Sequence, residues 1–100
     1  MMAHEFNPTP QQALAQETVA LVRDELSRYI AGAAESDGLS FALSRAAREA
    51  REKRILAEQL LVTLKDVWFA LPQVQGSDPT MRGYMLQRVI TMCIQEYYRS

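Results

Sequence analysis

The segment Ile55–Pro72, ILAEQLLVTLKDVWFALP, is the most apolar stretch of this 100-residue chain and decides its fold. On a helix at about 100° per residue, its large apolar side chains recur at the i, i+3, i+4, i+7 spacing of a helix packed on a core. Burial of each such side chain stabilises the fold by roughly 1.5–3 kcal/mol. Pro72 ends the helix, because proline disfavours helical geometry at the preceding residue. The broad apolar side consists of Leu56, Ala57, Leu60, Leu61, Leu64, Val67, Trp68 and Leu71.

A second, narrower apolar stripe lies on the opposite side of the same predicted helix. It consists of Ile55, Val62 and Phe69, which are seven residues apart and have charged and polar neighbours. A small helical domain can cover one broad side of a helix, but covering two opposite sides is harder. Two explanations are open: a terminal segment or loop of the same chain covers the stripe, or a helix of a second subunit does. The second explanation predicts a homodimer.

Composition places the chain among single globular domains. Apolar residues make up 48% of it, the formal net charge is −1 and the pI is about 5.8, a balance that argues against a dedicated nucleic-acid binder. Its longest uncharged runs have eleven residues, whereas a membrane-spanning helix needs about 20. The N-terminus, MMAHEFNPTP, lacks the basic flank and apolar core of a signal peptide. With one cysteine, Cys93, no internal disulfide can form, so we expect a cytoplasmic location.

Local signals divide the chain into a lead-in and one helical domain. Thr9-Pro10-Gln11-Gln12 has the pattern of a capping box with proline at the first helical position. Asp78 followed by Pro79 is a second helix start of this kind. One long helix is expected in the middle, although a change of direction near Arg51–Arg54 would divide it into two. We therefore predict a flexible lead-in over 1–8 and a single all-helical domain over 9–100, with helices at about 10–33, 39–71 and 79–98.

No catalytic or metal-binding constellation emerges from the residue types. His4 is the only histidine and lies in the lead-in, where nothing would hold its imidazole as a base. One histidine and one cysteine do not supply the several ligands of a metal site. Cys93 falls on the apolar side of the last helix, where it would behave as a small hydrophobe. We predict a non-enzymatic protein without catalytic residues, cofactor or metal.

The densest charge cluster lies between Arg45 and Arg54. Glutamates alternate with the cations, so that oppositely charged residues are four apart on one helix. This pattern is typical of a solvated face whose charges pair with each other. Two functional alternatives are an acidic protein partner, which would contact Arg45, Arg48 and Arg51, and a nucleic acid bound by the whole segment. The predicted pairs are Arg45–Glu49, Arg48–Glu52 and Glu49–Lys53.

The last helix carries its methionines apart from its main apolar side. Methionine is flexible and suits adaptable interfaces, although it fills cores as well. Met81, Met85 and Met92 are therefore predicted to extend the dimer seam of Ile55, Val62 and Phe69. A small-molecule sensor remains the alternative, and it would need a cavity near Trp68, Tyr29 and Tyr97.

Three pieces of the sequence, in order, resemble a known family. They are Leu26-Ser27-Arg28-Tyr29-Ile30, the leucines 60, 64 and 71 followed by Pro72, and the aromatic-ended helix from Tyr84 to Tyr98. Together they are similar to the N-terminal domain of RsbU-type bacterial stress phosphatases. The resemblance implies a helical domain that dimerises and binds an activating switch protein. In that family the region corresponding to Arg51–Arg54 is a proline-bearing break, which this chain lacks. The residues that carry the resemblance include no catalytic domain, so the resemblance implies no phosphatase activity.

These observations predict an all-α fold of three long antiparallel helices, or four, in a bundle completed by dimerisation. The expected function is protein–protein interaction in a dimeric bacterial regulatory or adaptor protein.

Overall fold

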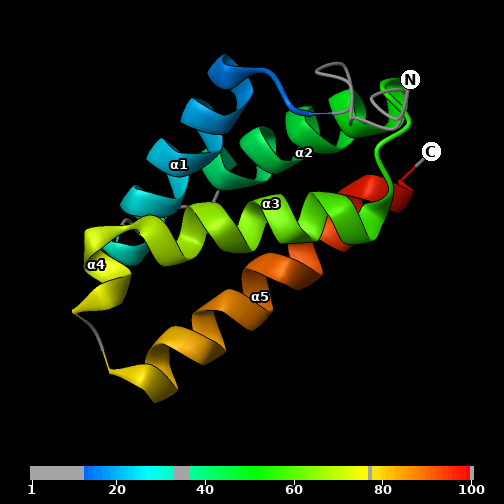
Figure 1. The fold of residues 1–100 in the computed structure, drawn as a ribbon. Helices are drawn as coiled ribbons and strands as arrows, with labels where there is room; N and C mark the ends of the chain where they lie inside the picture. The colour runs from blue at the N-terminus through cyan, green and yellow to red at the C-terminus, as the bar shows by residue number, and fades with distance from the viewer. Residues whose placement is uncertain (1–12, 33–36, 77, 100) are drawn as a thin grey trace, which may run out of the picture.

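The structure, a computed structural model, describes residues 13–32, 37–76 and 78–99. Within these ranges the chain forms five helices and no strand, so the predicted all-α fold class is confirmed. No helix in this part of the chain is both long and apolar enough to cross a membrane. The helices are α1 (Gln16–Ile30), α2 (Asp37–Glu52), α3 (Ala57–Ala70), α4 (Pro72–Gln75) and α5 (Pro79–Tyr98) (Figure 1).

Helix α2 forms the centre of the fold, because both α1 and α5 pack on it. Its buried face is rich in alanine: Ala42, Ala46, Ala47 and Ala50 are each at most 2% exposed. Small side chains let neighbouring helices approach closely. In Figure 1, α3 runs below α2 in the view, and α5 runs at an angle to α3.

Helix α3 closes the core with its broad apolar side. Leu60, Leu64 and Trp68 are at most 3% exposed, and Leu71 at the end of the helix is also buried. Leu56 is an exception to the predicted buried side, since 55% of it is exposed. It precedes the helix as its N-terminal cap and does not share the helix's inward face.

The predicted start of the first helix, at Thr9–Gln12, lies outside the described residues. Residues 13–15 are not helical, and α1 begins at Gln16. It ends at Ile30 and not at residue 33. The backbone of Gly32 has a φ of 91°, a left-handed conformation that glycine adopts without a steric cost, and its N–H donates to the carbonyl of Tyr29.

The segment 39–71 forms two helices and not one long helix, because the structure separates α2 from α3 near Arg51–Arg54, where the sequence left a change of direction open. The chain turns at Arg54, which has a left-handed φ of 62°. Its N–H donates to the carbonyl of Arg51 (3.2 Å), and the N–H of Ile55 donates to that of Ala50 (2.8 Å). These two bonds form a Schellman motif, which satisfies the last carbonyls of α2. The left-handed position usually holds glycine, so an arginine there leaves no signal in the sequence.

The end of α5 braces this turn. The hydroxyl of Tyr97 donates to the carbonyl of Ile55 (2.7 Å). Nη1 of Arg51 in turn donates to the carbonyls of Glu96 (2.9 Å) and Tyr97 (2.8 Å). Both carbonyls lie in the last turn of α5, where helix carbonyls need donors from outside the helix. Figure 1 shows the end of α5 beside the start of α3.

Proline and aspartate set the remaining helix ends where the sequence places them. Leu71 is extended, with a ψ of 130°, and Pro72 opens the short α4 instead of continuing α3. The carboxylate of Asp78 accepts a hydrogen bond from the N–H of Thr80 (3.5 Å), and α5 begins at Pro79.

Candidate functional site

Two of the three residues of the predicted second stripe lie on the surface. Val62 is 58% exposed and Phe69 is 51% exposed, both on the outer face of α3. Ile55, in contrast, is only 4% exposed. It precedes α3, and the left-handed turn at Arg54 directs it into the core. The exposed feature, which we name the α3 stripe, therefore consists of Val62 and Phe69 alone.

The methionines of α5 do not form a single exposed stripe. Met81 is 55% exposed, whereas Met85 and Met92 are half-buried against the core. The buried face of α5 passes through Val89 and Cys93, which brings Met85 and Met92 to its edge. Only Met81 is as accessible as the predicted dimer seam requires.

A surface that the sequence did not predict lies between the start of α3 and the end of α5. This α3–α5 groove has a volume of about 530 Å³. Leu56, Ile94 and Tyr98 are 55%, 38% and 70% exposed in it. The rings of Tyr97 and Tyr98 meet edge to face, with centroids 5.1 Å apart. Its lining residues are Leu56, Ala57, Glu58, Leu61, Ile94, Tyr97 and Tyr98.

The three arginines of the predicted basic face, Arg45, Arg48 and Arg51, have different surroundings in the structure. Arg51 is bound to the end of α5, as described above. Arg45 lies 4.0 Å from the carboxylate of Glu17 in α1, an exposed contact of little energetic weight. Arg48 is exposed and joins none of the ion pairs formed by the described residues. Only Arg48 is thus fully available to a partner.

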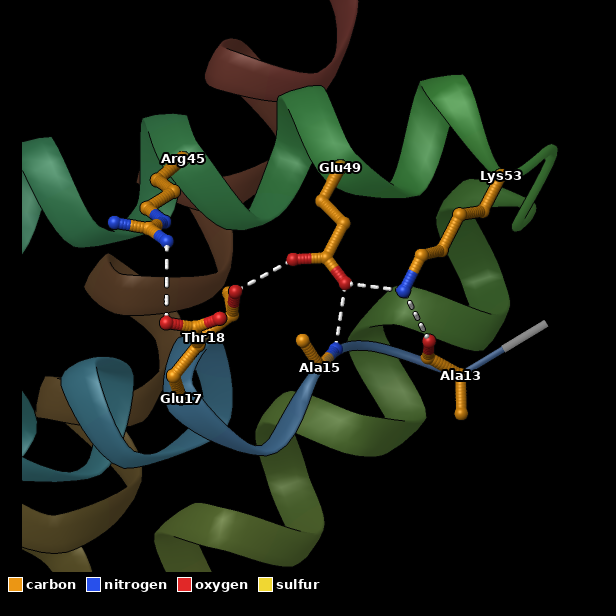
Figure 2. Close-up of polar contacts among 7 residues, drawn as sticks. All are labelled: Ala13, Ala15, Glu17, Thr18, Arg45, Glu49 and Lys53. Atoms are coloured by element: carbon orange, nitrogen blue, oxygen red, sulfur yellow. Dashed lines mark hydrogen bonds and ion pairs between the residues drawn. The ribbon is translucent and has the colours of Figure 1, made fainter. Parts of the chain in front are cut away.

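Glu49 links α2 to the beginning of α1 (Figure 2). Its carboxylate accepts hydrogen bonds from the backbone N–H of Ala15 (2.5 Å), the hydroxyl of Thr18 (2.5 Å) and Nζ of Lys53 (2.6 Å). Nζ of Lys53 also donates to the carbonyl of Ala13 (3.0 Å). Because Ala15 has no side-chain oxygen, Glu49 acts as the cap that α1 otherwise lacks.

These contacts set the ionisation of Glu49. Burial would raise the pKa of its carboxyl, but the hydrogen bonds from Lys53, Thr18 and Ala15, together with the charge of Lys53, outweigh burial and lower the pKa. Of the three predicted helical pairs, only Glu49–Lys53 occurs among the ion pairs of the described residues. The carboxylate is fully engaged, so we assign it a structural role.

The groups that could carry out chemistry are held apart or buried. Cys93 is 1% exposed, and burial, with a smaller effect from the charge of Glu96, raises the pKa of its thiol to about 11. A thiol of this kind is a poor nucleophile at neutral pH. His4 lies outside the described residues. Within the described ranges, no three histidine, cysteine, aspartate or glutamate side chains come together as metal ligands.

Within the described residues, a small void of about 10 Å³ lies among apolar core side chains that include Val22, Leu43 and Leu64. This is roughly the space of one water molecule. The Nε1 of buried Trp68 has no hydrogen-bond partner among the described residues, but Trp68 does not line this void. The core as it stands has no room for a metabolite there.

Comparison of the chain with protein-family models, with curated proteins and with solved structures found no match.

Proposed function

We propose that this chain is a non-enzymatic helical interaction module that forms a homodimer through the outer face of α3. The observation that carries the proposal is the exposure of Val62 and Phe69, at 58% and 51%, on a helix whose other large apolar residues pack inward or line the α3–α5 groove. The resemblance to the N-terminal domains of RsbU-type phosphatases supports a regulatory role in bacteria.

The energy available from this face predicts a weak dimer. Full burial of a valine or phenylalanine side chain contributes roughly 1.5–3 kcal/mol. Because Val62 and Phe69 are each about half exposed, dimerisation can gain about half of this free energy for each side chain. Two copies of the α3 stripe would then contribute on the order of 4 kcal/mol, against an association cost of at least similar size. Polar contacts around the stripe must supply the rest, and the dimer should be concentration-dependent.

Sedimentation equilibrium of the wild-type protein and of Phe69→Asp tests the proposal. The wild-type mass should rise towards that of a dimer as the concentration approaches about 1 mM. Phe69→Asp should remain a folded monomer over the same range, because a carboxylate cannot be buried there without a partner. Phe41→Asp is the matched control, since Phe41 is 63% exposed on α2 and should leave the association unchanged. A wild-type monomer at every concentration would overturn the proposed dimer.

An acidic protein partner on α2 is the second candidate function. Phe41 and the unpaired Arg48 line the same surface hollow of about 410 Å³, together with Arg45. An aromatic ring beside a guanidinium suits a partner that presents an apolar side chain next to a carboxylate. Arg48→Glu should abolish retention of an acidic partner from the source cytoplasm, whereas Arg23→Glu, on the exposed side of α1, should not. Equal retention by both variants would exclude this surface.

A further inference from the structure

Lys65 and Asp66 place a positive and a negative charge on the two flanks of the α3 stripe, and Glu58 lies on the flank of Lys65, seven residues before it. Lys65 and Asp66 lie between Val62 and Phe69, about one helical turn from each. Successive residues of a helix are about 100° apart, so the two charges project to opposite sides of the stripe. Both side chains are exposed.

Neither charge has a partner within the described part of the subunit. The residues three and four positions away from Lys65 and Asp66 along α3 are all uncharged, so no i, i+3 or i, i+4 pair can form. The ion pairs formed by the described residues also omit both side chains. Their charges are therefore available to a molecule that covers the stripe.

Resting on the proposed dimer, we propose that the occupant of this face is a second copy of the chain, whose α3 runs parallel to the first. A two-fold axis along the helices brings each flank of the stripe against the opposite flank of the partner. Lys65 then meets Asp66 of the partner subunit, and the same contact occurs again on the other side. Val62 and Phe69 each meet their own counterpart between these charges.

The charges select this arrangement over the antiparallel one. A two-fold axis perpendicular to α3 brings each flank against its own copy. In the antiparallel register that buries both apolar residues, Val62 would face the partner's Phe69, and Lys65 would face the partner's Lys65. Like charges directly opposed across an interface weaken association and suppress that pairing. The parallel arrangement buries both apolar residues and places Lys65 against the partner's Asp66 on both sides, with only Glu58, in the first turn of α3, near its own copy.

Charge reversal with a mixing experiment tests the parallel arrangement. Lys65→Glu makes both flanks negative, and Asp66→Lys makes both positive, so each variant alone should dimerise about tenfold more weakly than wild type. An equimolar mixture should form a heterodimer in which every flanking contact is again between opposite charges. Sedimentation equilibrium of each variant and of the mixture measures these effects. As a control, Arg28→Glu and Asp24→Lys change exposed charges on α1 by the same amounts, and they should affect neither self-association nor mixing.

The outcomes separate this inference from the proposed function. If wild type is a monomer throughout, the homodimer itself fails, and the parallel arrangement fails with it. If wild type dimerises and Phe69→Asp abolishes the dimer, but both charge variants and their mixture behave like wild type, the homodimer through α3 stands and the parallel arrangement is refuted. If Lys65→Glu weakens the dimer while Asp66→Lys does not, and mixing restores nothing, the helices pair antiparallel with Lys65 against the partner's Glu58, and the parallel arrangement is refuted.

Discussion

Replacing Arg54 by glycine should stabilise the protein, and the sign of this effect depends on the break between α2 and α3. Arg54 has a φ of 62°, a region that costs a residue with a Cβ roughly 1–2 kcal/mol. Glycine removes this cost but loses more backbone entropy on folding, by roughly 0.5–1 kcal/mol. The Arg54 side chain is exposed and makes no hydrogen bond or ion pair with the described residues, so nothing else is lost. The net expectation is a gain of roughly 0.5–1 kcal/mol in the free energy of unfolding.

Urea denaturation of the wild type, Arg54→Gly and Arg54→Ala measures this gain. Arg54→Ala keeps the Cβ and should stay within about 0.5 kcal/mol of wild type, because it is a surface substitution without partners. If residues 39–71 formed one continuous helix, the order would reverse, since glycine in a helix interior costs about 1 kcal/mol relative to alanine. Arg54→Gly less stable than Arg54→Ala would therefore refute the left-handed turn.

Three further predictions concern Glu49 and Tyr97, which are half-buried, and Cys93, which is buried. Because the folded-state pKa of Glu49 is lowered from 4.5, its carboxylate stabilises the fold above that pH and loses this contribution as the pH falls through the folded-state pKa. Glu49→Gln should therefore be less stable than wild type by about 1–2 kcal/mol at neutral pH. In denaturation curves measured across pH, this difference in the free energy of unfolding should shrink towards pH 3. A difference that stays constant with pH would contradict the lowered pKa of Glu49. The thiol of Cys93, with a pKa of about 11, should react with a disulfide reagent only after unfolding, so reaction at the rate of a free thiol in the native protein would show that it is accessible. Tyr97→Phe removes the hydrogen bond to the carbonyl of Ile55 and should lower the free energy of unfolding by about 1 kcal/mol. An unchanged free energy of unfolding would show that this hydrogen bond does not stabilise the turn at Arg54.

Several features of the fold follow from neighbouring residues alone. The 3.6-residue period predicts the buried side of α3 from Leu60 to Leu71, and the alanines of α2 indicate close helix packing. Pro72 and the Asp78-Pro79 pair mark helix ends, because their effects act on the adjacent backbone. Such signals depend on residues at most a few positions apart, and a sequence displays them directly.

Contacts between distant segments decide the rest. The turn at Arg54 contains neither glycine nor proline, and its braces come from Tyr97 and Arg51, which join positions more than 40 residues apart. That turn rotates Ile55 into the core and leaves Leu56 in the α3–α5 groove, which reverses the burial predicted for both. Likewise, α1 begins beside Glu49 of α2, which accepts hydrogen bonds from the N–H of Ala15 and the hydroxyl of Thr18, although the local signal is an earlier capping box. Periodicity specifies which faces of this chain are apolar, but only the packing of one helix on another decides which of those faces stay in water.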